Sequence, residues 1–508
     1  MASSSIVPIQ VGQVAERQCA KASNPQSPLG EHHPLFTMPS KGITVYSYIG
    51  VPGYEVGFAV PQQEVLHDVA HNFTSRQLEI DSSHIQGLGN FTGRFQWTVF
   101  RYGEQVAGAH NEVNSLTGKI EGGTMVATQD FHPIVTEDAI ITYGFYAAGH
   151  GEVGLTDRHQ CYVTICSREN REWMGSVAPP GSPAAQQPFS RFVLAAPHDN
   201  GMNGMTACEA IFQHLDSDML AVVRRLVPLL EHVNHVPDHF LMKKLPHIVY
   251  GLSITQKKTV STMLAMGARY FEFRPAKLLP MFQKVSALRD TFYFQHACIP
   301  GIAFDEFLRE QVAFLDENQT EIVTIHIRWD NIVADCQRPT EDEISDLFNE
   351  ACARAVRSPL TWGTRECFEQ PIEDLRRTGT RLIVVIEADK YDSWTAEAYA
   401  TLSADSIIDR FESMTTEGQA DSDLTILQCQ ATSQSIKEVL IYSVFSAAAA
   451  SSCLTSTKGM LDMQTLPWIR KNALDRLRAE RTIVLMNDFI DGATVDTSIM
   501  LSRQRLSL

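Results

Sequence analysis

From Arg191 to the C-terminus, short apolar segments alternate with amphipathic ones, and this alternation limits the folds the chain can adopt. The apolar segments read FVLAA, RYFEFR, TFYFQH, EIVTIHIR, RLIVVIEAD, LTILQCQA and TIVLMNDF. Between them lie helical patterns, one of which opens with a capping box from Thr340 to Glu343. Apolar strands separated by helices are typical of a parallel sheet covered by helices. Seven such strands favour a TIM-like (β/α) barrel over an open sheet.

The part of the chain before this region has a different pattern. Residues 1–40 are rich in Ser, Pro and Gln and predict an irregular arm. Residues 41–172 show short segments of period two, with Phe95, Trp97 and Val99 on one face, and predict an all-β sandwich. Residues 173–190 contain SVAPPGSPAAQQP and predict a Pro/Ser-rich linker. Residues 191–508 then form the barrel domain, so the 508-residue chain has two folded parts.

Charge and hydropathy exclude several classes of protein. The formal net charge of −17 disfavours nucleic acid as a partner. No uncharged apolar run is long enough for a transmembrane helix. The N-terminus lacks the basic start and apolar centre of a secretory signal, so we expect a cytoplasmic protein. The oligomeric state cannot be read from the sequence.

Polar and charged residues follow almost every apolar segment of the predicted barrel. They are His198, Asp199, Asn200, Glu272, Arg274, His296, His326, Arg328, Asp330, Glu387, Asp389, Asn487 and Asp488. The carboxyl ends of parallel strands meet on one face, where barrel enzymes carry their sites. His326 is flanked by Ile325 and Ile327, so we interpret it as a core histidine. Solvation explains any one of the others alone, but not their repetition from strand to strand.

This set of residues suits the cleavage of a phosphodiester. The reaction needs a base for the attacking hydroxyl, an acid for the leaving oxygen and a cation for the phosphoryl charge. Histidine serves both proton-transfer roles near neutral pH. A guanidinium can replace a metal ion as the cation.

Six motifs, in order, resemble the phosphatidylinositol-specific phospholipase C family in its metal-independent bacterial and fungal branch. They are REWMG, LAAPHDNG, STMLAMGARYFEFR, FYFQHA, FLDENQTEIVTIHIR and TIVLMNDFID. The resemblance runs from about Trp173 to the C-terminus. It leaves out the β-rich N-terminal part, whose role the sequence does not indicate.

The resemblance implies a role for each matching position. His198 would be the general base, oriented by Asp488, and His296 the general acid, assisted by Asp199. Arg274 would stabilise the phosphoryl charge, supported by Glu272. For substrate contacts we expect Arg328, Asn200 and Glu387.

The same resemblance bears on cofactors. Calcium-dependent relatives carry acidic ligands at positions that the resemblance matches to Arg274 and Arg328 of this chain. Two guanidinium groups there would repel a divalent ion. We therefore expect no metal and no other cofactor. Ca²⁺ is the less favoured alternative, with Asn200, Glu272 and Glu387 as its ligands.

The chain also departs from the family pattern. Pro197, Asn200, Pro275 and Ala297 differ from the usual residues, and an insertion spans roughly residues 206–258. Because of these departures, two substrate classes stay as alternatives. One is a lipid or glycolipid head group at a membrane surface, and the other is a soluble phosphodiester. It is also open whether the product is a cyclic phosphate or a monoester.

Three functional hypotheses follow. The first is a phosphodiesterase of the phosphorus–oxygen lyase type. The second is a metal-dependent glycerophosphodiester-type hydrolase on the same barrel. The third is a non-catalytic barrel that acts as a binding module. Retention of both histidines, the arginine and the final aspartate favours the first hypothesis.

Overall fold

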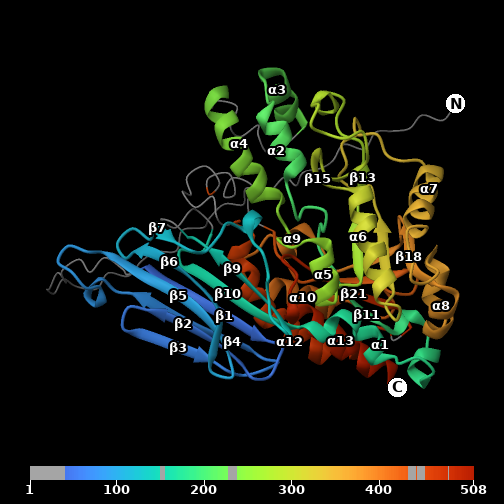
Figure 1. The fold of residues 1–508 in the computed structure, drawn as a ribbon, viewed down its shortest axis with the longest axis horizontal. Coiled ribbons are helices and arrows are strands. Elements are labelled where there is room, and N and C mark those ends of the chain that lie inside the picture. Colours follow the sequence, from blue (N-terminus) through green and yellow to red (C-terminus); the bar gives the residue numbers. More distant parts are fainter. Residues whose placement is uncertain are drawn as a thin grey trace, which may run out of the picture. The chain divides into compact units, whose positions relative to one another are not determined.

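The computed structural model describes residues 41–148, 155–226, 237–432, 442, 452–478 and 480–507. The chain divides into two units, Met1–Pro39 and Ser40–Leu508. The predicted N-terminal arm lies outside the described residues. Within the second unit a β-rich part, drawn in blue to cyan in Figure 1, is followed by an α/β part drawn in green to red.

The β-rich part contains two five-stranded sheets among the described residues. The first has the order β4 (Phe73–Ile80), β1 (Lys41–Ile49), β10 (His159–Ser167), β9 (Ala139–Tyr146), β8 (Ile134–Val135). The second has the order β3 (Gln63–His67), β2 (Tyr54–Val60), β5 (Thr92–Arg101), β6 (Glu104–Asn114), β7 (Ile120–Gly123).

Alternating apolar residues bring these two sheets onto one shared core. Phe95, Trp97 and Val99 of β5 are fully buried, as their period of two predicts. They pack in one cluster with residues of the other sheet, among them Val45 and Ile141. One pairing differs from an antiparallel arrangement, because β1 and β10 run parallel.

The α/β part contains two four-stranded parallel sheets among the described residues. One has the order β11 (Val193–Pro197), β21 (Thr482–Asn487), β20 (Leu424–Gln428), β19 (Lys390–Asp392). The other has the order β12 (Tyr270–Phe273), β16 (Val323–Ile327), β18 (Thr380–Ile386), β17 (Thr361–Gly363). The Arg269 amide donates to the Ala195 carbonyl oxygen at 3.0 Å, which links β11 with the start of β12.

The segment TFYFQH does not join a parallel sheet, and this corrects the sequence interpretation. Its strand β14 (Tyr293–His296) pairs antiparallel with β13 (Pro275–Ala276) and β15 (Ile299–Ala303). The short turn between β14 and β15 explains the difference, because a parallel connection needs a crossover of about a dozen residues.

Helices separate the strands of the α/β part. They are α1 (Trp173–Val177), α2 (Thr206–Gln213), α3 (Ser217–Leu226), α4 (Asp238–Ser253), α5 (Val260–Met266), α6 (Phe304–Glu317), α7 (Glu341–Cys352), α8 (Ile372–Thr378), α9 (Ala396–Tyr399), α10 (Asp405–Ser413), α12 (Thr455–Arg476) and α13 (Gly492–Leu506). The capping box predicted at Thr340 and Glu343 is confirmed at the start of α7.

The segment expected to be a linker, residues 173–190, is packed. Trp173, Ala185 and Phe189 are buried in the core of the α/β part. The Ser182 side chain accepts from the Ala185 amide, so Pro183 begins a short capped turn. The domain limits at residues 172 and 191 stay a prediction.

Helix α13 connects the two parts, because it contacts β1 and β10 as well as β11 and β21. Gly492 at its start has no room for a side chain, since a Cβ would lie 2.9 Å from the Cβ of Cys166 in β10. Among the described residues, no helix combines the length and apolarity that a membrane crossing requires.

Candidate active site

The first and last strands of the α/β part bring His198 and Asp488 together. Strands β11 and β21 pair in parallel up to Pro197 and Asn487. The His198 amide then donates to the Asn487 carbonyl oxygen at 3.0 Å. Each strand is followed by one of the two residues, so the register sets their side chains next to each other.

The His198 ring is held by two carboxylates. Its Nδ1 lies 2.7 Å from Asp488 Oδ1, and its Nε2 lies 3.8 Å from Asp199 Oδ2. The side chain is 23% exposed, so the ring remains accessible. Burial alone would lower the pKa of His198, but the charges of Asp199 and Asp488 outweigh it and raise the pKa to about 9.

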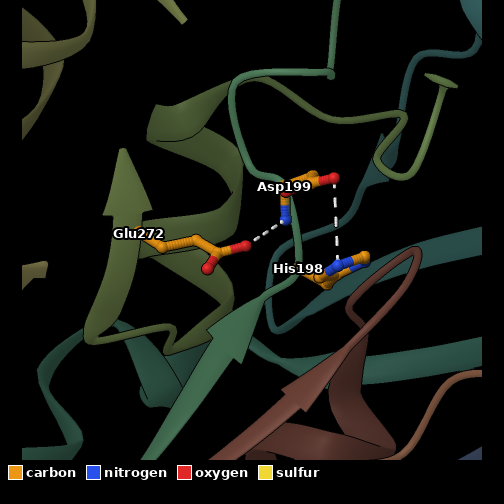
Figure 2. Close-up of side chains that lie close together, drawn as sticks. All are labelled: His198, Asp199 and Glu272. Carbon is orange, nitrogen blue, oxygen red and sulfur yellow. Dashed lines mark hydrogen bonds and ion pairs between the residues drawn. The ribbon is translucent and has the colours of Figure 1, made fainter. Parts of the chain in front are cut away.

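The carboxylate of Asp199 contacts three charged or titratable side chains, those of His198, Arg274 and His296. Its Oδ1 pairs with Arg274 Nη2 at 2.6 Å, and its Oδ2 lies 3.6 Å from His296 Nε2. Figure 2 shows Asp199 between His198 and Glu272, with the backbone amide of Asp199 directed at the Glu272 carboxylate. One carboxylate therefore touches both histidines and the arginine.

Glu272 is fully buried beneath this cluster. It accepts from the Asp199 amide at 3.0 Å, pairs with Arg328 and lies 3.6 Å from Arg274 Nη2. Burial opposes its negative charge, but Arg328, Arg274 and His198 together hold the pKa of Glu272 well below its usual range. Glu272 is thus a fixed anion that orients two guanidinium groups.

His296 is the more exposed histidine, with 35% of its side chain accessible. Burial lowers its pKa, and the charge of Arg274 lowers it further. The carboxylate of Asp199 acts in the opposite direction, but the pKa of His296 stays below its usual value. In the resting protein His198 therefore holds a proton more tightly than His296. The antiparallel strand β14 still delivers His296 to Asp199, although it is not one of the parallel strands.

Four residues within two positions of a strand end in this region have a strained backbone. Asp199, Ala297, Glu387 and Phe489 have φ between 43° and 58°. This left-handed region is unfavourable for residues other than glycine and recurs at functional sites. Three of the four directly follow His198, His296 or Asp488.

The three residues expected to contact substrate have different surroundings. Arg328 pairs with Glu272 and, through Nε, with Asp330 Oδ1 at 2.8 Å, so its guanidinium is held on both sides. Asn200 is fully buried, and neither atom of its amide has a hydrogen-bond partner among the described residues. Glu387 accepts from the Trp329 amide at 2.8 Å. The Asn200 amide must move before it can touch a ligand.

The interpretation of His326 as a core residue agrees with its contacts. Its Nδ1 lies 2.6 Å from the Tyr270 hydroxyl, and its Nε2 accepts from the Ala388 amide at 3.1 Å. Burial lowers the pKa of His326 to about 3, so the ring is neutral.

Three groups are spaced closely enough to hold a metal ion. Ligand atoms of His198, Asp199 and Glu272 lie within 4.8 Å of one another. The two carboxylates are already paired with Arg274 and Arg328. A divalent ion would compete with these guanidinium groups, so the donor set fits a cation poorly.

Sequence reasoning missed Thr255 and Gln256, which lie in the loop between α4 and α5. Both are buried, and both hydrogen-bond to the backbone of the strand ends that carry His198 and Asp488. They belong to the segment interpreted as an insertion. A polar Thr-Gln pair ahead of a buried helix is the signal that could have singled them out.

The fold and the site together define an α/β protein with two histidines, an arginine and carboxylates at the ends of its strands. No family model matches the chain, and no curated protein matches it.

Comparison with solved structures matches bacterial phosphatidylinositol-specific phospholipases C. The enzyme of Listeria monocytogenes is 12% identical with a TM-score of 0.36, covering 65% of this chain and 98% of its own. A structure described as "Modulation of S.aureus Phosphatidylinositol-Specific Phospholipase C Membrane Binding" is 12% identical with a TM-score of 0.37, covering 66% and 97%. This is the family that the sequence motifs resemble.

Proposed function

We propose that the protein is a phosphodiesterase of the phosphorus–oxygen lyase type, similar to phosphatidylinositol-specific phospholipase C. The observation that carries the proposal is the contact of one carboxylate, Asp199, with Arg274, His198 and His296. A candidate base, a candidate acid and a cation thus lie around one carboxylate.

In the proposed reaction a hydroxyl of the substrate attacks the neighbouring phosphorus. His198 Nε2 takes the hydroxyl proton, while Asp488 on Nδ1 stabilises the imidazolium that forms. Arg274 stabilises the charge on the phosphoryl oxygens. The bond from phosphorus to the leaving oxygen breaks as His296 gives that oxygen a proton. The products are a cyclic phosphodiester and an alcohol, and the proton that His198 gained balances the one that His296 lost.

The resting protonation states are the reverse of those this reaction requires. His198 is protonated near neutral pH and His296 is neutral, because their pKa values are raised and lowered respectively. A bound phosphodiester anion raises the pKa of a nearby imidazole and so favours protonated His296. The productive form is then a minor species with a bell-shaped pH dependence.

We also propose that the two parallel sheets are arcs of one barrel. The hydrogen bond from the Arg269 amide to the Ala195 carbonyl oxygen supports this, since it joins their edges at β11 and β12. The substrate class, a lipid or glycolipid head group or a soluble phosphodiester, and the cytoplasmic location belong to the same proposal.

A metal-dependent glycerophosphodiester-type hydrolase is the second candidate. The spacing of His198, Asp199 and Glu272 favours it. The pairing of Asp199 and Glu272 with arginines favours the metal-independent lyase.

A panel of phosphodiesters, including phosphatidylinositol vesicles and a soluble inositol phosphodiester, tests both candidates with and without chelator. The lyase keeps its activity in chelator, and ³¹P NMR detects a cyclic phosphate first. Activity that chelator abolishes and a divalent ion restores would identify the hydrolase. Absence of turnover on every substrate, or full turnover by both His296→Ala and Arg274→Ala, would overturn the proposal.

A further inference from the structure

The Gln256 side chain is fully buried beside the ends of β11 and β21. Its Nε2 donates to the His198 carbonyl oxygen at 2.9 Å and to the Asn487 carbonyl oxygen at 3.0 Å. Its Oε1 accepts from the Ile490 amide at 3.0 Å. Both protons and the oxygen of this amide are therefore used, all on backbone groups of the two catalytic strand ends.

These bonds replace a sheet ladder that stops at this point. The pairing of β11 with β21 ends at Pro197 and Asn487, and Pro197 has no amide proton. The backbone after each strand then adopts a left-handed conformation, at Asp199 and at Phe489. Without Gln256, the carbonyl oxygen of His198 and the buried amide of Ile490 would lose these hydrogen bonds.

Thr255 acts on the two strained residues themselves. Its Oγ1 donates to the Asp199 carbonyl oxygen at 3.1 Å, and its own carbonyl oxygen accepts from the Phe489 amide at 2.7 Å. The Thr255–Gln256 dipeptide thus holds both sides of the His198–Asp488 pair at once. Because the loop that contains it is far from both strands in sequence, it acts as an external brace.

We propose that Gln256 is a positioning residue that keeps the His198 imidazole on the Asp488 carboxylate, and that Thr255 supports it. The catalytic role of His198 rests on the proposed function. The positioning role of Gln256 and Thr255 depends only on their hydrogen bonds to the two strand ends.

The test uses the full chain with ¹⁵N-labelled histidine, in which the His198 resonance is assigned by its loss in His198→Gln. Gln256→Met keeps the length of the side chain and its neutrality but removes all three hydrogen bonds. We expect the titration midpoint of His198 to fall by about one unit or more, because the ring separates from Asp488. We expect kcat to fall about a hundredfold with little change in KM, as misplaced catalytic groups cause.

Gln419→Met is the matched control. Gln419 is also fully buried and bridges Thr425 and the Arg478 amide, away from the two strand ends. Its loss should lower stability and leave the His198 titration unchanged. A wild-type midpoint in Gln256→Met, or an equal shift in Gln419→Met, would overturn the proposal.

Two outcomes require an additional variant or readout. If Gln256→Met does not fold, Thr255→Val removes a single hydroxyl from the same brace, and an unchanged His198 midpoint in that variant overturns the proposal. If the wild-type protein cleaves no phosphodiester, the titration still decides the role of Gln256. The proposed function can therefore fail without the positioning role failing, and the reverse also holds.

Discussion

His198 and Asp488 lie 290 positions apart in the sequence, yet their side chains form a 2.7 Å hydrogen bond. The bond depends on the parallel pairing of β11 with β21. It leaves Nε2 of His198 directed towards Asp199. In the proposed mechanism Nε2 is therefore the ring nitrogen that takes the proton of the substrate.

The pH dependence of activity follows from the two histidines. We expect a bell-shaped kcat/KM profile whose acidic limb lies below the usual histidine pKa and whose basic limb lies near the His198 pKa of about 9. Asp488→Asn removes a carboxylate from His198 and should move the basic limb to lower pH. Asp316→Asn, which alters a carboxylate bound to the amides of residues 356–358, is the control and should not move it. A basic limb that stays in place in Asp488→Asn would contradict the assignment.

The stability of the fold should depend on pH through the same ring. The folded-state pKa of His198 is raised, so the proton is bound more tightly in the folded than in the unfolded state. The stabilisation is fully present below the unfolded pKa of about 6.5 and is lost as pH rises through about 9. Urea unfolding of wild type and His198→Gln should give free energies that converge over this window. A difference that grows with pH would refute the prediction.

Arg274 should be sensitive to a conservative change. Its Nη2 already pairs with Asp199. In the proposed mechanism its guanidinium also binds the phosphoryl group, and lysine cannot reproduce two such contacts together. We expect Arg274→Lys to lower kcat by about 10²–10³. Arg381→Lys changes a buried arginine that binds the Leu315 and Asn318 carbonyl oxygens, and should lower stability with kcat unchanged. Equal kcat values in the two variants would remove Arg274 from the mechanism.

The strained residue after His296 offers a stabilising substitution. Ala297 has φ of 58°, which glycine adopts without steric cost. We expect Ala297→Gly to raise the free energy of unfolding by about 0.5–1 kcal/mol. Ala210→Gly, inside helix α2, should lower it by a similar amount. Urea unfolding measures both, and destabilisation in both variants would show that the backbone at Ala297 carries no strain.

The attachment of the β-rich part to the α/β part can be tested at Tyr48. Its buried hydroxyl donates to Asp496 Oδ2 at 2.9 Å and accepts from Arg470 Nη2 at 3.0 Å. We expect Tyr48→Phe to cost about 1–3 kcal/mol, since it removes one hydrogen bond from each of the two charged partners. Tyr102→Phe changes a 78% exposed side chain and should cost almost nothing. Equal melting temperatures for the two variants would show that this contact does not hold the parts together.

The sequence by itself determined the local features of the fold. Apolar segments between amphipathic ones specify strands and helices, and the alternation of Phe95, Trp97 and Val99 specifies which face of β5 is buried. Strand ends are marked by the polar residues that follow them, so His198, Arg274, His296 and Asp488 could be singled out without a structure. These signals are readable because burial acts on each segment with the period of its own backbone.

Only the tertiary structure decided which strands are neighbours and what fills the space between them. The sequence does not distinguish the antiparallel strand β14 from a parallel one, because its apolar pattern is the same in both. Nor does the polar pair Thr255–Gln256 show in the sequence that the Gln256 amide binds His198 and Asn487, which lie 58 and 231 positions away. Long-range pairing depends on how all segments pack at once, so the distances that make a site out of these residues exist only in the folded chain.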